Sequence, residues 1–300
     1  MIPFERFRPE KKAEYDRFLQ RCEMRGCEYS FANLCLWGRQ YGAVLENHLL
    51  LFSHFGGKSV YPYPVGSGSV RPALEALMAD AKERGIPFRL TCLTKADCEE
   101  LETLYPGRFY FFSDRDSADY IYDIHRLASL TGKKLQAKRN HINRFLEANP
   151  QWRTEVITQQ LLPYCNQLLQ RWYAAHKNEA ELSMEKYALY TGLANLNELE
   201  LEGLLLFAGD TPVALSLGSR LNETVFDVHF EKADADIPGA YPLINREFAR
   251  YIQKKCPEIR YFNREDDMGL PGLRRAKESY TPDLLLEQYW AVWVEESDYV

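Results

Sequence analysis

The chain contains 300 residues, of which 46% are apolar and 27% are charged, and its formal net charge is −6. These proportions are typical of a folded globular protein and exclude a disordered or fibrous chain. The acidic balance also excludes a uniformly basic nucleic-acid coat, so a polyanionic partner would have to bind a local basic patch. At this length we expect two domains or one large one.

The sequence carries no signal for export, membrane insertion or metal binding. The first twelve residues include no apolar segment of the kind found in secretory signals. The longest apolar runs, such as residues 204–208, are far shorter than the ~20 residues that span a bilayer. Seven cysteines without a C-x-x-C pair favour reduced, structural thiols. We therefore expect a cytoplasmic protein with no integral membrane segment and no metal site.

The first half of the chain predicts helices and strands in a definite order. Helices are expected at residues 10–21 and 30–41, and the run AVLENHLLLFSHF from residue 43 predicts a β-hairpin that turns at Glu46-Asn47. Then follow a strand (60–63), a Gly-Ser turn (66–69), a helix from Pro72 to Gly85, a strand (88–93), a helix (96–104) and a strand (120–124).

The second half repeats this order roughly 165–170 residues later. The predicted elements are helices (161–177, 184–194), a hairpin (204–207, 213–217), a strand (224–230), a turn at Gly239 that leads into a helix, a strand (259–262), a helix (270–279) and a strand (284–294). The match is one of element order and not of residue identity. It predicts an α+β protein of two tandem units, residues 1–125 and 126–300.

A predicted helix at residues 127–146 joins the two units. Residues 126–144 contain six Lys and Arg residues and no acidic residue. Lysine and arginine are typical contacts to a phosphate backbone, although most charged helix faces are simply solvated. We predict that this helix binds a polyanion through Lys134, Lys138, Arg139 and His141.

The order hairpin, strand, glycine turn, helix and strand resembles the acyl-CoA N-acyltransferase (GNAT) fold, in which the turn and the helix N-terminus hold a cofactor pyrophosphate. The usual Gln/Arg-x-x-Gly-x-Gly/Ala pattern of that turn is matched here only at Gly239, and Asp236 is negative where a phosphate requires a positive charge. The turn at Gly66-Ser67-Gly68 also lacks an upstream Arg or Gln. We therefore interpret both turns mainly as helix entries, which argues against coenzyme A as the cofactor.

Three longer motifs resemble one bacterial family. They are TGKKLQAKRNHINRF (131–145), VHFEKAD (228–234) with GAY (239–241) after it, and NREDDMGLPGLRRAK (263–277). The family is grouped with the C-terminal domain of phosphatidylglycerol lysyltransferase, and the resemblance is clearest over residues 120–290. It implies two tandem GNAT-like domains with a cleft between them and a relation to the Fem peptidoglycan aminoacyltransferases. It also implies transfer of an aminoacyl group from aminoacyl-tRNA to a lipid-headgroup or small-molecule acceptor.

The resemblance also implies roles for particular residues. A Leu-Arg-x-x-Lys segment supplies a functional lysine in that family, and the matching positions here include Arg274 and Lys277. An acidic residue upstream of the lysine would fall near Glu265. The family's Asp-x-x-Arg motif is matched at Asp227, while Phe230 stands in the place of its arginine.

The residues themselves suggest a site at the end of a strand. Residues 263–267 follow a predicted strand and precede Gly269, so we expect them in a loop, where functional side chains are common. Glu265 there can act as a general base or bind an α-ammonium group, and the alternative is an acidic turn that caps a helix. The residues predicted to bind substrate are Asn263, Arg264, Arg274 and Tyr241.

Two further pairs offer the same choice between a catalytic and a structural role. Arg274 and Lys277 lie one helical turn apart and can stabilise an oxyanion or a tRNA phosphate, or form a basic surface that pairs with the acidic loop. His229 and Glu231 share one face of a strand and can form an acid–base pair, whereas a histidine in a strand is more often structural.

These observations predict an aminoacyltransferase or N-acyltransferase-like enzyme in which an amine or hydroxyl acceptor attacks an activated ester directly. Direct transfer agrees with the absence of a Gly-x-Ser-x-Gly elbow and of a recognisable Cys/His pair in the sequence. The alternative is a catalytically inactive GNAT-fold protein with a binding or regulatory role.

Overall fold

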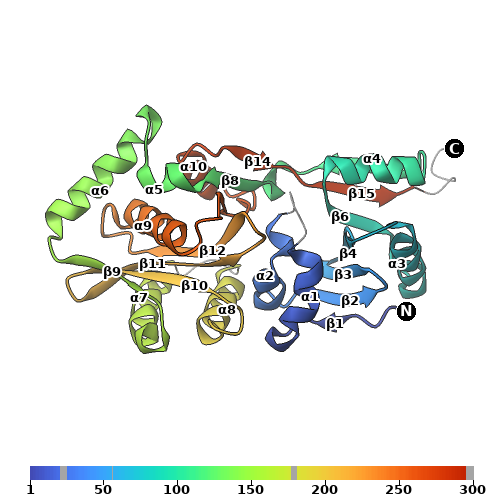
Figure 1. Ribbon diagram of the computed structural model, residues 1–300, viewed down its shortest axis with the longest axis horizontal. Helices are drawn as coiled ribbons and strands as arrows, with labels where there is room; N and C mark the ends of the chain where they lie inside the picture. The colour runs from blue at the N-terminus through green and yellow to red at the C-terminus, as the bar shows by residue number, and fades with distance from the viewer. Residues whose placement is uncertain (21–25, 56, 177–180, 295–300) are drawn as a thin grey trace. The chain divides into compact units, whose positions relative to one another are not determined.

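The computed structural model describes residues 1–20, 26–55, 57–176 and 181–294 and divides into two compact units. The first unit comprises Met1–Asp119 together with the chain from Leu286 onward, and the second comprises Tyr120–Leu285. Each unit contains a mixed β-sheet with helices against it, which confirms the predicted α+β class (Figure 1).

The sheet of the first unit has the order β1-β2-β3-β4-β6-β15-β7, with β5 paired to β3. Its strands are β1 (Glu5–Arg6), β2 (Gln40–Leu45), β3 (His48–Phe55), β4 (Lys58–Pro62), β5 (Val65–Gly66), β6 (Arg89–Leu93), β7 (Phe109–Ser113) and β15 (Tyr289–Trp293). Its α-helices are α1 (Lys12–Leu19), α2 (Phe31–Leu36), α3 (Arg71–Arg84) and α4 (Lys95–Leu104). Strands β4 and β6 are parallel.

The sheet of the second unit has the order β14-β8-β13-β12-β11-β10-β9. Its strands are β8 (Asp119–Asp123), β9 (Trp152–Val156), β10 (Glu202–Ala208), β11 (Thr211–Arg220), β12 (Val225–Ala233), β13 (Tyr261–Asn263) and β14 (Leu284–Leu286). Its α-helices are α5 (Ile124–Ser129), α6 (Gln136–Ala148), α7 (Leu162–Ala175), α8 (Glu181–Ala194), α9 (Ala240–Lys255) and α10 (Pro271–Glu278). Strands β12 and β13 are parallel.

The two sheets have the same strand order, but each contains one strand from the other half of the chain. Strand β8 follows β7 in the chain and lies between β14 and β13, whereas β15 follows β14 and lies between β6 and β7. In Figure 1, β8 (green) accordingly lies by α10 and β14, and β15 (red) lies by β6. The observed division therefore differs from the predicted units 1–125 and 126–300, because the C-terminal strand completes the first sheet. The single strand predicted at 284–294 is two strands in two sheets.

The helix predicted at 127–146 is interrupted. Helix α5 ends at Leu130, whose φ of 52° is left-handed, and Gly132 with a φ of 91° turns the chain again before α6 begins. The Arg139 guanidinium donates to the carbonyl oxygens of both residues. The backbone acceptors that the break exposes therefore have a hydrogen-bond partner. The first-half helix predicted at 30–41 is likewise shorter, because the chain turns at Gly38 (φ 60°) into β2. The predicted helix ends at Arg21 and Lys177 lie outside the described residues.

Each sheet buries an apolar face under one long helix, at the spacing expected from the sequence. In the first unit α3 buries Leu74 and Leu77 and ends at Gly85, which adopts a φ of 67°. In the second unit α9 buries Ile244 and Phe248 on the same face. Among the residues described, no helix is long and apolar enough to cross a membrane.

The exchanged strand makes the first unit depend on the C-terminal segment. Ala291 of β15 is fully buried in the core of the first unit. Ala291→Asp places a carboxylate there, and we expect the first unit to lose about 3 kcal/mol or more of stability. Hydrogen exchange should then show lost protection in β6 and β7 while β10 and β11 stay protected. Ala276→Asp, at an exposed position of α10, is the control, and unchanged protection of β6 and β7 in Ala291→Asp would contradict the assignment.

Candidate functional site

The candidate site lies where the parallel strands β12 and β13 stop pairing. Only three residue pairs join them, and the last is Asp227 with Asn263. Beyond this pair β12 continues beside β11 to Ala233, while the chain after Asn263 leaves the sheet as a loop. The side chains at the end of this short ladder belong to the second unit throughout.

A buried hydrogen-bonded network centres on His229. Its Nε2 lies 2.8 Å from Ser219 Oγ on β11, and its Nδ1 lies 3.1 Å from Glu265 Oε1 and 3.5 Å from Asp227 Oδ2. The side chains of Asp227 and His229 are 0% and 1% exposed, whereas that of Glu265 is 18% exposed. Glu265 is therefore the carboxylate of this network that solvent or a substrate can reach.

The two carboxylates fix the tautomer of the imidazole. Because both approach Nδ1, the proton of a neutral His229 is favoured on that nitrogen, where it donates to Glu265. Nε2 is then an acceptor for the hydroxyl of Ser219. The structure thus brings together three predicted site residues, and it adds Ser219, which no sequence pattern indicated.

Glu265 is held in place by a strained turn. Its backbone φ is 57°, a left-handed conformation that is unusual for a residue other than glycine. This conformation costs about 1–2 kcal/mol. Its backbone N–H donates to Asn263 Oδ1 at 2.8 Å, and its carbonyl oxygen accepts from the Tyr120 N–H at 3.1 Å. Asn263 therefore shapes the loop that presents Glu265 to His229.

Glu231 does not pair with His229, as the shared strand face had suggested. Its carboxylate forms a salt bridge with Arg264 and accepts from Asn245 Nδ2 at 3.0 Å. Tyr241 donates to the Glu231 carbonyl oxygen at 2.8 Å. Glu231, Arg264 and Tyr241 thus form a second cluster next to the histidine network.

Lys277 lies on α10 and is buried against the loop. Its ammonium group donates to the carbonyl oxygens of Arg264, at 2.6 Å, and Asp266, and its side chain is in the core side of α10. Tyr122 donates to the Lys277 carbonyl oxygen at 2.8 Å. The lysine therefore binds the carbonyl oxygens of the residues immediately before and after Glu265.

Arg274 pairs with the acidic loop. This is the structural role that the sequence analysis gave as the alternative to a catalytic one. Its Nε and Nη2 each lie 2.8 Å from a different oxygen of Asp267, which is fully buried and also accepts from Tyr120 and from the Gly269 N–H. Burial alone would raise the pKa of Asp267, but the hydrogen bonds from Arg274 and Tyr120 hold that pKa well below its usual range. The importance of Asp267 was not apparent from the sequence.

The four predicted polyanion-binding residues, of which Lys134 precedes α6 and the other three lie on it, differ in their surroundings. Lys134 and His141 are exposed. Arg139 caps the end of α5, and Lys138 donates to Ser279 Oγ at 2.7 Å while its ammonium lies 4.0 Å from the centre of the Tyr280 ring. Two of the four side chains therefore have partners within the second unit.

The turn before α9 is closely covered by α6. Gly239 has a φ of 89°, and a Cβ atom there would lie 2.3 Å from the His141 carbonyl oxygen and 2.9 Å from Phe145 Cβ. Only glycine fits this approach of two backbones. The turn thus acts as a packing contact and a helix entry.

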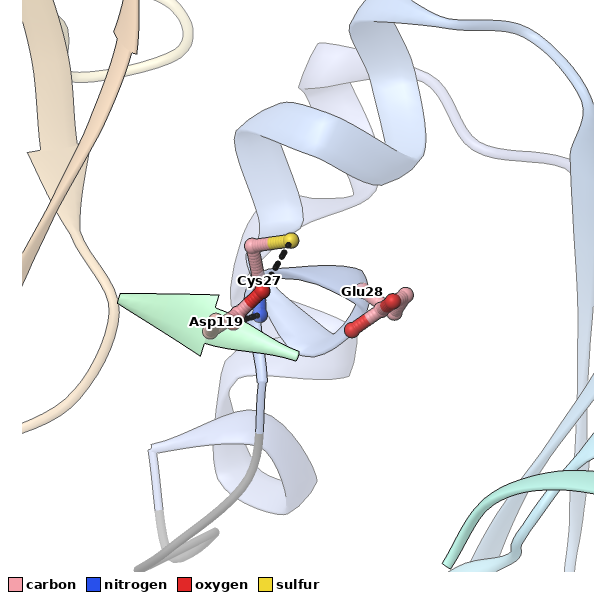
Figure 2. A group of neighbouring side chains, drawn as sticks. All are labelled: Cys27, Glu28 and Asp119. Atoms are coloured by element: carbon pink, nitrogen blue, oxygen red, sulfur yellow. Dashed lines mark hydrogen bonds between the residues drawn. The ribbon is translucent and has the colours of Figure 1, made fainter. Parts of the chain in front are cut away.

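Within the described part of the chain, two groups of side chains have donor atoms close enough to share a divalent cation. In each of them, Asp227–His229–Glu265 and Cys27–Glu28–Asp119, the ligand atoms lie within 4.8 Å of one another, and such N, O and S donors are those of zinc-type sites. Figure 2 shows the second group, in which the Cys27 N–H donates to Asp119 at 2.8 Å and its thiol lies 3.5 Å from the other carboxylate oxygen. This contact lies within the first unit, to which both Cys27 and Asp119 belong.

The Asp267–Arg274 pair predicts a specific acid sensitivity. Because the pKa of Asp267 is lower in the folded than in the unfolded state, its contribution is complete above about pH 4 and is lost as the pH falls further. Asp267→Asn should cost about 3 kcal/mol at pH 7 and flatten the decline of stability below pH 4 in urea unfolding experiments. Asp236→Asn, at an exposed position, is the control. An equally steep acid decline in Asp267→Asn would contradict this role.

Comparison with known proteins places the chain in a family. Residues 19–292 match the family model described as phosphatidylglycerol lysyltransferase, C-terminal. A conserved protein of unknown function from Bacteroides thetaiotaomicron is 37% identical, with a TM-score of 0.93 over 98% of this chain and 100% of that one. L-PGS from Bacillus licheniformis is 15% identical, with a TM-score of 0.69 over 100% of this chain and 96% of that one, and shares the fold.

A curated relative, an uncharacterised protein of Mycoplasmoides gallisepticum, is 25% identical over 182 residues, which are 58% of this chain. The match spans 55% of that relative's length. The family match covers most of the chain and agrees with the resemblance of the three sequence motifs. The chain belongs to the family of the phosphatidylglycerol lysyltransferase C-terminal domain.

Proposed function

We propose that this protein is an aminoacyltransferase that moves an aminoacyl group from aminoacyl-tRNA to an amine or hydroxyl acceptor. The observation that carries the proposal is the contact of Glu265 with His229 at the end of the β12–β13 ladder. A carboxylate that is partly exposed and backed by a buried, oriented imidazole is suited to accept a proton. Membership of the lysyltransferase family supports aminoacyl transfer as the reaction class.

In the proposed reaction Glu265 removes the proton of the acceptor as its nitrogen or oxygen attacks the ester carbonyl of the donor. The tetrahedral intermediate then collapses, the bond from the carbonyl carbon to the ribose oxygen breaks, and that oxygen takes the proton. His229 holds the Glu265 carboxylate in position for this proton transfer through Nδ1–H, and Asp227 and Ser219 fix the orientation of the imidazole ring. Lys277 is a positioning residue, because it binds the carbonyl oxygens of the residues before and after Glu265.

Two features favour aminoacyl-tRNA over coenzyme A as the donor. The turn that would hold a cofactor pyrophosphate packs against α6 at Gly239 and carries the negative charge of Asp236. Lys134, just before α6, and His141, on α6, are exposed, and basic side chains of this kind bind a phosphate backbone. In this proposal the acceptor is a small molecule or a lipid headgroup. The experiment below distinguishes a hydroxyl acceptor from an amine acceptor.

The proposal predicts that Glu265→Gln lowers the transfer rate about 10²-fold or more, because an amide cannot accept the proton. The melting temperature should stay within a few degrees of the wild type, since Gln keeps the shape of the side chain. The measurement uses radiolabelled total aminoacyl-tRNA, with phosphatidylglycerol vesicles as the hydroxyl acceptor and a lysine-containing peptide as the amine acceptor.

Glu223→Gln removes an exposed carboxylate of the same unit and serves as the matched control. If neither acceptor is labelled by the wild type while the protein still binds tRNA in a gel shift, a catalytically inactive binding protein is the better description. Transfer by Glu265→Gln at the rate of Glu223→Gln would refute the role of the network.

A further inference from the structure

Strand β7 forms one edge of the first sheet, and its exposed side chains are aromatic. It pairs with β15 on one side, and among the described residues no strand pairs with its other side. Tyr110 and Phe112 are 64% and 38% exposed. The Phe112 ring stacks on the Trp290 ring of β15, with 5.8 Å between their centres, and its centre lies 5.9 Å from that of Tyr110. These three rings form one apolar patch of the first unit, which we call the β7 patch.

The backbone of β7 has hydrogen-bonding groups that face away from β15. The Val294 N–H donates to the Arg108 carbonyl oxygen, and hydrogen-bonded positions alternate along an antiparallel pair of strands. In the register of β15 and β7, the N–H and C=O groups of Phe109, Phe111 and Ser113 therefore point to the free edge. A row of such groups is a template for a further strand.

Two other sheet edges carry charged residues, which discourage edge-to-edge pairing. Strand β1 consists of Glu5 and Arg6, and β9 contains Arg153 and Glu155, whose charged groups lie 2.8 Å apart. Strand β7, with the sequence FYFFS, contains neither a charged residue nor a proline. It therefore lacks the features that commonly keep an edge strand from pairing with another chain.

The charges at the two ends of β7 are complementary to those of a second β7. Arg108, which is partly exposed, precedes the strand, and the exposed Asp114 follows it. Two β7 strands that run antiparallel about a twofold axis at Phe111 pair over their full length. In that register Arg108 of each copy lies opposite Asp114 of the other. Tyr110 then lies opposite Phe112, so aromatic rings of the two copies meet on the same face.

We propose that a second copy of this chain binds along β7 and joins the two first sheets edge to edge in a symmetric dimer. The edge is complementary to itself, in charge and in apolar surface, which favours a second copy over a different protein. Because both copies use the same strand, the interface closes at two copies and leaves no free β7 edge. The inference is independent of the proposed aminoacyl transfer.

The test is sedimentation velocity of the full chain from micromolar to submillimolar concentrations, with a thiol reductant because the chain contains seven cysteines. We expect a reversible equilibrium between monomer and dimer. Arg108→Asp and Asp114→Arg should each raise the Kd of the dimer about tenfold or more, because like charges then meet at two symmetric positions. A mixture of these two variants should regain an affinity close to that of the wild type, since both positions again hold opposite charges.

Two matched variants serve as controls. Lys82→Asp changes the charge by the same amount at an exposed position of α3 and should leave the Kd within about twofold. Tyr110→Ser removes a ring of the β7 patch and should weaken the dimer, whereas Tyr187→Ser, at a position of the second unit that is 69% exposed, should not. The melting temperatures should stay within a few degrees of the wild type, because each altered side chain is at least partly exposed.

Hydrogen exchange of the wild type is a second measurement, and it needs no variant. The Phe111 N–H should exchange several-fold more slowly in concentrated than in dilute protein. The Thr154 N–H, which faces away from β10 on the edge strand β9, should exchange at an unchanged rate.

Several outcomes would overturn the proposal. One is a wild type that stays monomeric at every concentration, including one whose β7 patch binds phospholipid vesicles instead. Another is a dimer that Arg108→Asp and Asp114→Arg leave unchanged, or a mixture of the two variants that fails to associate. Growth into open-ended chains of copies would equally contradict a closed, symmetric interface.

Discussion

The buried carboxylate of Asp267 is the interaction on which the candidate site depends. It accepts hydrogen bonds from Arg274 of α10, from Tyr120 of β8 and from the backbone of Gly269. The loop is thereby tied both to α10, which follows it, and to β8, which lies far away in the chain. Lys277 adds a second tie from the same helix, to the carbonyl oxygens of residues 264 and 266. With its backbone held at these points, Glu265 adopts a left-handed conformation and meets His229.

The exchange of β8 and β15 supplies one of these anchors. Tyr120 lies on β8, which follows the first set of strands in the chain but pairs within the second sheet. The site of the second unit therefore includes a strand that the repeat would assign to the first half. Each sheet contains one internal strand that comes from the other half of the chain. Neither half is therefore expected to fold completely alone.

The sequence was sufficient for the order of the longer helices and most central strands, and for part of the site. Helical spacing and turn residues placed α3 and α9 correctly, and Asp227, His229 and Glu265 do meet. The partners of these residues were not predictable, because Ser219 comes from a neighbouring strand whose register no local pattern specifies. Strands β7 and β9 were missed, since FYFFS and WRTEV lack a clear apolar alternation. The burial of Lys277 was not predictable, because α10 has a strongly basic composition that conceals its buried face.

The central claim is that two carboxylates hold a proton on Nδ1 of a buried imidazole and leave Nε2 to accept from Ser219. Nitrogen-15 NMR of the His229 ring near neutral pH measures this directly. We expect Nδ1 to carry the proton. In Ser219→Ala, the nitrogen-15 chemical shift of Nε2 should move toward the value of an imidazole nitrogen that accepts no hydrogen bond. A ring with its proton on Nε2 and a bare Nδ1 between Asp227 and Glu265 would contradict it.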